Sequence, residues 1–136
     1  MNLPNATRPL NSASLCLVAG LLPASLGAST LEGTWLTPPD RNGITAHIEA
    51  RPCGAALCGT IARTFDPAGR EVRTPNLGRT VFWDMKPTGA GTYEGRAYVP
   101  AHDRNYDGVI SLAGNRAEVS GCLGPVCMGQ TWQRVR

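Results

Sequence analysis

The stretch ITAHIEARPCGAALCGTIART, residues 44–64, decides the fold class. Apolar and polar residues alternate from Ile44 to Ala50, which is the period-two pattern of a half-buried β-strand. A Pro-Cys-Gly breaker follows, and a second β-rich run extends from Leu57 to Thr64. Cys53 and Cys58 flank the turn between the two runs. The segment therefore predicts a β-hairpin whose tip is closed by a disulfide.

Similar β-rich runs, separated mostly by short turns, fill the rest of the chain after its first thirty or so residues. They add six expected strands to the two of the hairpin, at residues 33–37, 80–86, 92–99, 105–112, 116–121 and 128–135. Consecutive hairpins without crossovers predict an all-β fold, an eight-stranded antiparallel up-and-down barrel, with a two-sheet β-sandwich as the alternative. Barrel closure is favoured because it removes exposed strand edges. The long segment 65–79 has room for a short hairpin extension at 70–73 and is expected to cover the barrel mouth as a lid.

The N-terminal residues have the composition of an export signal. An apolar run at residues 15–22 ends at Pro23, and small residues after it provide a cleavage region. We therefore expect a signal peptide at residues 1–28, a single barrel domain at residues 29–136, and a periplasmic or secreted location in a bacterium. The apolar run is far shorter than the ~20 residues of a membrane-spanning helix, so no membrane span is expected.

Charge and cysteine content agree with an exported domain. The chain has 13 basic and 10 acidic residues without a basic cluster, so no nucleic-acid partner is expected. Four of its five cysteines lie beyond the expected signal peptide, in two pairs of equal spacing. The two cysteine-containing turns lie at opposite ends of an up-and-down barrel, a distance that no disulfide spans. The expected disulfides are therefore Cys53–Cys58 and Cys122–Cys127.

Four segments of the chain resemble a known bacterial secreted family, the domain of unknown function 2147. They are GTW (33–35), CGAALCGTI (53–61), the run from Tyr98 to Tyr106, and GQTWQRV (129–135). The resemblance extends over nearly the whole mature chain and implies a small lipocalin-like β-barrel that is exported and has no established activity. The loop at 65–79 departs from the family pattern, because TPNL stands where relatives have an Asp-x-Asn-Pro run.

The first expected strand is also similar to the first-strand motif of lipocalins, through Gly33 and Trp35. That resemblance implies that Trp35 closes the base of the barrel. It also implies that a basic residue of the last strand, here Arg134, packs on the indole in a cation–π contact. This pair is expected to be structural and to form the barrel seam.

No motif for catalysis or metal binding is present in the sequence. It has no nucleophile elbow, phosphate loop or zinc-protease motif, and its carboxylates lie singly on outward strand faces. His47 is expected on the surface and His102 in a solvated loop, too far apart in sequence to suggest a zinc site. We therefore expect no enzyme activity, no cofactor and no metal.

Aromatic residues on the predicted strand faces suggest a binding function instead. Trp83 and Met85 are expected to share one face of their strand, and the candidate lining of the barrel interior is Trp83, Met85, Tyr93, Tyr106 and Trp132. If these side chains leave a cavity, the protein would bind a small, partly apolar molecule. If they fill the barrel, it would be a disulfide-stabilised envelope module that acts through protein–protein contacts of its loops, with a partner the sequence does not name.

Four loops are expected to gather at one end of the barrel, those at 38–43, 65–79, 100–105 and 122–127.

Overall fold

The computed structural model describes Cys16, Ala19, Gly20 and residues 30–136. The expected signal peptide and its cleavage site therefore lie almost entirely outside the described residues. The strands are β1 (Gly33–Leu36), β2 (Thr45–Cys53), β3 (Ala56–Phe65), β4 (Glu71–Val72), β5 (Thr80–Gly89), β6 (Thr92–Val99), β7 (Arg104–Ala113), β8 (Arg116–Leu123) and β9 (Val126–Arg134), with a short 3-10 helix, η1 (Pro100–His102), between β6 and β7.

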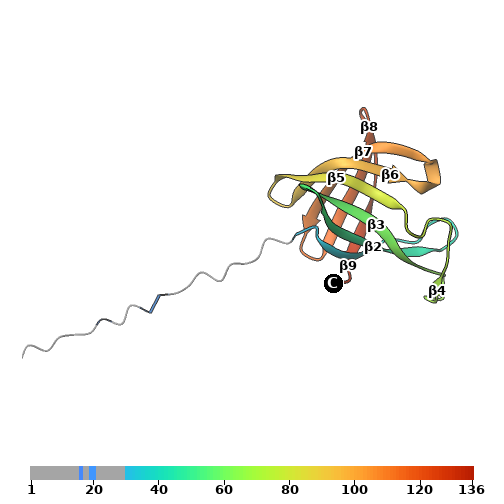
Figure 1. Ribbon diagram of the computed structural model, residues 1–136, viewed down its shortest axis with the longest axis horizontal. Helices are drawn as coiled ribbons and strands as arrows, with labels where there is room; N and C mark the ends of the chain where they lie inside the picture. Colours follow the sequence, from blue (N-terminus) through green and yellow to red (C-terminus); the bar gives the residue numbers. More distant parts are fainter. Residues whose placement is uncertain (1–15, 17–18, 21–29) are drawn as a thin grey trace, which may run out of the picture.

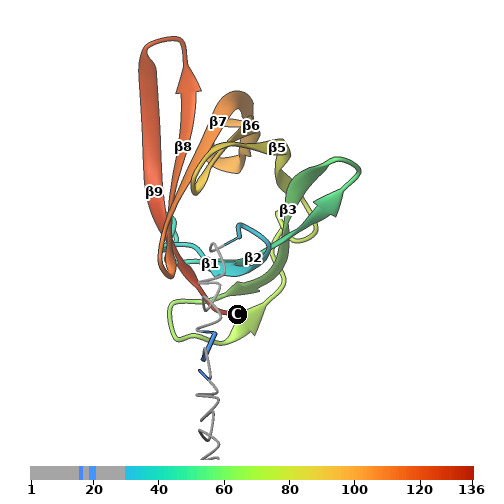
Figure 2. The ribbon, with the colours of Figure 1, turned by 90° about the vertical axis from the view of Figure 1, so that its left-hand side faces the viewer.

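The strands form one antiparallel sheet that closes on itself (Figures 1 and 2). The order around the sheet is β2-β1-β9-β8-β7-β6-β5-β3, and the pairing of β2 with β3 completes the ring. The short strand β4 pairs with the end of β3, at Thr64 and Phe65. The expected eight-stranded up-and-down barrel is confirmed, and the β-sandwich alternative was wrong.

Both cysteine pairs join neighbouring strands at hairpin ends. In the β2–β3 hairpin Cys53 is opposite Ala56, and the Cys53–Cys58 disulfide crosses the strands diagonally with 5.6 Å between the Cα atoms. In the β8–β9 hairpin Cys122 lies directly opposite Cys127, with 4.1 Å between the Cα atoms. Each disulfide therefore ties one hairpin at its tip and does not link distant parts of the barrel.

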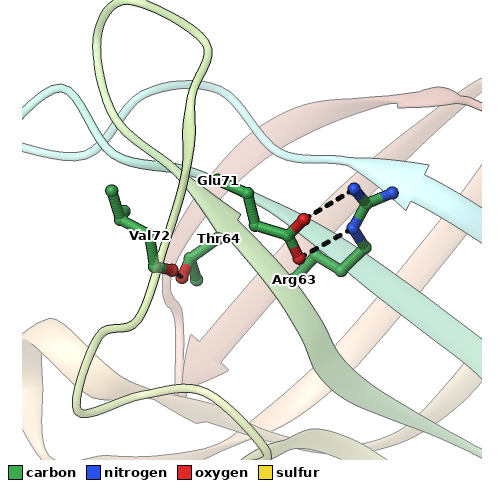
Figure 3. A network of polar contacts seen from close by, with 4 residues as sticks. All are labelled: Arg63, Thr64, Glu71 and Val72. Atoms are coloured by element: carbon green, nitrogen blue, oxygen red, sulfur yellow. Dashed lines mark hydrogen bonds and ion pairs between the residues drawn. The ribbon is translucent and has the colours of Figure 1, made fainter.

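The short strand β4 is held to β3 by side chains (Figure 3). The guanidinium of Arg63 donates two hydrogen bonds, of 2.9 and 2.8 Å, to the carboxylate of Glu71. The hydroxyl of Thr64 donates to the carbonyl of Val72. The expected hairpin extension at 70–73 is therefore present, and it pairs with the end of β3.

The barrel interior is filled by large apolar side chains. The most completely buried are Leu31, Trp35, Ile48, Phe82, Met85 and Ile110. Glycine on β3 makes room for one of them, because a Cβ atom at Gly59 would lie 2.1 Å from the ring of Phe82. At native packing density such an interior leaves few voids larger than a water molecule.

A β-bulge in β5 changes which side chains face the core. The pairing register with β6 shifts between Trp83 and Lys86, and Asp84 adopts φ = 51°, a left-handed conformation that is uncommon outside glycine. As a result Phe82 and Met85 both face the interior, although strict alternation would place them on opposite faces. The expectation that Trp83 shares the face of Met85 was wrong: Trp83 lines a hollow on the outer surface.

Candidate functional site

Four of the five residues expected to line the interior do lie there. Met85 is 1% exposed, Tyr106 and Trp132 are each 6% exposed, and Tyr93 packs half-buried against the core. They contact other core residues: the methyl group of Met85 occupies the space beside Gly108, and the Tyr106 ring occupies that beside Gly121. The structure thus places these residues together as core packing, and Trp83 apart from them.

The polar ends of these aromatic residues already have hydrogen-bond partners. The Tyr93 hydroxyl accepts the backbone N–H of Leu31 at 3.3 Å. The Tyr106 hydroxyl lies 2.9 Å from Nδ1 of His102 on η1. His102 is exposed, in line with its expected place in a solvated loop, and its ring also contacts this buried phenol. A ligand in the barrel would have to displace these contacts to use either hydroxyl.

The expected contact between Trp35 and Arg134 is present at the barrel seam. The guanidinium carbon of Arg134 lies 4.2 Å from the centroid of the Trp35 ring. Its nitrogens also donate to the carbonyls of Thr30 and Glu32, at 2.6 and 3.1 Å. On the inner side, Nε1 of Trp35 donates to the carbonyl of Leu31 at 2.8 Å. One arginine thereby fixes the segment before β1 against the last strand.

Comparison with known proteins gives the family. The family model described as an uncharacterised protein conserved in bacteria, DUF2147, matches residues 33–134. The chain belongs to this family. Among curated proteins no match was found for this DUF2147 member. A solved structure similar to it is protein HP1028 of the human pathogen Helicobacter pylori, which is described as belonging to the lipocalin family.

The likeness of this DUF2147 chain to the Helicobacter protein is a likeness of fold. Sequence identity is 17%, the TM-score is 0.60, and the match covers 79% of this chain and 84% of the other. The DUF2147 chain is therefore a lipocalin-like barrel of uncharacterised function. Its bacterial family and two disulfides are consistent with a place outside the cytoplasm.

Two hollows of this DUF2147 protein lie on the outside of the barrel. One, of about 290 Å³, is lined by Arg79, Thr80, Trp83, Tyr98 and Asn105. The other, of about 300 Å³, is lined by Thr30, Glu32, Gly33, Thr34, Ala50 and Arg51. Both are open to solvent. Sequence reasoning missed the first because its residues come from the loop before β5 and from three different strands, and no local motif joins them.

The tip of the β8–β9 hairpin holds three of the four large apolar side chains that are exposed in the described part of the chain. We define the hairpin tip as residues 122–131. Three exposed apolar side chains lie on it, Leu123 at 52%, Val126 at 67% and Met128 at 41% exposure. No residue from Val119 to Gln133 is charged. Figure 2 shows this hairpin projecting beyond the neighbouring strands.

His47 is the titratable group with an unusual environment on β2. Its ring is half-buried, 4.7 Å from the ring of Phe65, and its Nδ1 is buried without a hydrogen-bond partner among the described residues. Burial, followed by the positive charges of Arg63 and Arg136, lowers the pKa of His47 below its ordinary value of 6.5.

Within residues 30–136 and the three described residues before them, no three His, Cys, Asp or Glu side chains gather as metal ligands. No helix of that part of the chain is long and apolar enough to cross a membrane.

Proposed function

We propose that the protein is an exported binding module with a packed core that acts through its outer surface. Its hairpin tip would take up an extended, uncharged segment of a partner protein in the bacterial envelope. The observation that carries this proposal is an unpaired strand edge on an apolar, uncharged and disulfide-tied hairpin. A signal peptide at residues 1–28 and a periplasmic or secreted location belong to the same proposal.

The open edge belongs to β9. Strand β1 pairs with β9 only at Arg134 and Gln133, whereas β8 pairs with β9 along its whole length. From Val126 to Thr131 the second edge of β9 therefore has no neighbouring strand among the described residues. An edge of this length offers unpaired N–H and C=O groups to an incoming strand.

The side chains at the tip also suit strand addition. Natural proteins commonly block such edges with charged residues or an inward-pointing charge, and the tip has neither. Val126 and Met128, two residues apart on β9, point to the same side and would contact alternate side chains of the added strand. An uncharged partner segment is favoured because burying an unpaired charge there would be costly.

Photo-cross-linking in the intact envelope tests the proposal. A photo-reactive residue at Gln130 should give one adduct of defined mass, and the same residue at Glu94, an exposed position on β6, should not. Adding Val126→Lys should abolish the Gln130 adduct, because a lysine on the edge opposes strand addition. Equal adducts at both positions, or an adduct that survives Val126→Lys, would contradict the proposal.

A second candidate is the binding of a small, partly apolar molecule inside the barrel. It is supported by the likeness of fold to a member of the lipocalin family. Native mass spectrometry of protein purified without denaturation separates the two candidates and reports signal cleavage. A reproducible extra mass that leaves on unfolding would support a carrier. A protein that carries no extra mass and takes up no apolar probe would exclude the carrier and support the surface-binding module, in agreement with the filled interior.

A further inference from the structure

The hollow of about 290 Å³ on the outer face of β5, β6 and β7 has a composition unlike the rest of that face. Two aromatic residues, Trp83 and Tyr98, line it together with Arg79, Thr80 and Asn105. The neighbouring outward residues are the ion pair Arg96 and Asp107. An indole and a phenol that line one hollow on an outer strand face are not needed for the packing of the core.

The indole is on this face because of the bulge in β5. The left-handed conformation of Asp84 lets Phe82 and Met85 both point inward, and Trp83 then points outward beside Arg96 of β6. Bulges that re-aim a side chain are frequent next to binding sites. The backbone strain at Asp84 is therefore associated with the placing of one aromatic residue on the surface.

The phenol is fixed in orientation by charged neighbours. The hydroxyl of Tyr98 donates to Oδ1 of Asp103 at 2.8 Å and accepts from Nη1 of Arg79. The Arg79 guanidinium carbon also lies 5.4 Å from the centroid of the Tyr98 ring. The bond to Asp103 favours the protonated phenol and raises the pKa of Tyr98 above its ordinary value. The ring is thus a pre-oriented platform.

The polar groups around the two rings indicate what kind of ligand the hollow could bind. Arg79 uses one nitrogen on Tyr98, and the amide of the exposed Asn105 has no hydrogen-bond partner among the described residues. The two charged groups bonded to the Tyr98 hydroxyl, Arg79 and Asp103, balance each other. The pair Arg96 and Asp107 on the same face is also balanced. Balanced charges favour a neutral ligand over a phosphate or a carboxylate.

We propose that this hollow, with Trp83 and Tyr98 as its platform, binds neutral pyranose rings of a polysaccharide. A pyranose has apolar C–H faces, which stack on aromatic rings, and hydroxyls at its edge, which match the donors and acceptors of Arg79 and Asn105. The hollow is open and shallow, so it supports a ring within a chain better than it encloses a single sugar. The site is separate from the hairpin tip.

A titration with defined oligosaccharides tests this site. We would add cellohexaose, maltohexaose or hexa-N-acetylchitohexaose, three neutral chains that differ in linkage or in sugar, to isotopically labelled protein and follow its amide and indole resonances. At least one chain should shift the Trp83 indole resonance and the amides of residues 79–83 and 98–105. The indoles of Trp35 and Trp132, both buried, should stay unchanged. No shift with any of the three chains would overturn the proposal.

Variants then locate the binding. Trp83→Ala should weaken it about tenfold or more, the equivalent of one lost aromatic contact, whereas Trp83→Phe should retain part of it. Tyr98→Phe should weaken it less, because the ring remains and only its orientation loosens. Leu123→Ser on the hairpin tip is the control and should bind as the natural protein does. Binding that Trp83→Ala leaves unchanged, or binding of a polyanionic sugar in place of the neutral chains, would contradict the proposal.

Discussion

The guanidinium of Arg134 lies on the face of the Trp35 indole, with its carbon 4.2 Å from the ring centroid. The same guanidinium donates hydrogen bonds to the carbonyls of Thr30 and Glu32. Trp35 is fully buried, so one side chain closes the barrel end and ties the first strand to the last. In a barrel this seam is the pairing that joins residues farthest apart in the sequence. The entropic cost of bringing these two strands together is correspondingly large.

Arg134→Gln should therefore destabilise the protein by about 2–3 kcal/mol, from one cation–π contact and two charged hydrogen bonds. Arg134→Lys should recover part of the loss, since it keeps the charge but not the planar group. Urea unfolding followed by circular dichroism measures this, with Arg116→Gln, an exposed arginine of β8, as the control. An unchanged unfolding midpoint for Arg134→Gln would show that the seam contact contributes no stability.

Gly59→Ala should destabilise the barrel through overpacking. The added Cβ would lie 2.1 Å from the Phe82 ring, and forced repacking of a filled core costs about 1–3 kcal/mol. Gly89→Ala, where a Cβ meets no atom within 4 Å, is the matched control. Combining Gly59→Ala with Phe82→Leu should give less than the sum of the two single losses, because the smaller side chain leaves room. Additive losses would indicate that the two positions do not compete for the same space.

Asp84 should respond to substitution according to backbone conformation. With φ = 51°, a β-branched residue is strained, so Asp84→Val should cost about 1–2 kcal/mol, whereas Asp84→Asn should be close to neutral. Asp84→Gly should be neutral or stabilising, since glycine adopts this conformation without a steric cost. Thermal unfolding of the three variants gives the order. Equal stability of the Val and Gly variants would mean that the bulge is not strained.

His47 should make the stability fall in mildly acidic solution. Its folded-state pKa is below 6.5, so the unfolded chain binds the extra proton first as the pH decreases. The stability that neutral His47 provides is complete above pH 6.5 and decreases as the pH falls from there toward the lowered folded-state pKa. His47→Gln should therefore make the free energy of unfolding depend less on pH in this range. Above about pH 7.5 the difference in that free energy between the variant and the natural protein should be constant. Urea unfolding between pH 8 and pH 5 is the measurement, and parallel profiles for both proteins would contradict it.

Much of the fold could be predicted because its signals are local. Alternation from Ile44 to Ala50 and the breaker before Gly54 fix a hairpin without knowledge of any distant residue. The same holds for the consecutive hairpins after Thr80, and an unbroken meander has few ways to close. The pairing of the cysteines followed from that topology together with the short reach of a disulfide.

The outer surface could not be predicted in the same way. At Asp84 the alternation of inward and outward side chains along β5 is interrupted, and this depends on the register with both neighbouring strands. Because the sequence does not show the interruption, simple alternation placed Trp83 inside. Arg79, Tyr98 and Asn105 meet only after the barrel closes. The contact of His102 with Tyr106 likewise depends on the short helix after β6, for which the sequence has only Pro100 as a signal.

The two disulfides have a consequence for how an exported chain would mature. Each joins cysteines only five positions apart, and the partner of each is the next cysteine to emerge beyond residue 30. A chain crossing a membrane from its N-terminus would thus present the correct pairs in order, Cys53 with Cys58 and later Cys122 with Cys127. Oxidation in order of arrival yields the native bonds, so maturation should depend on a dithiol oxidase and not on a disulfide isomerase.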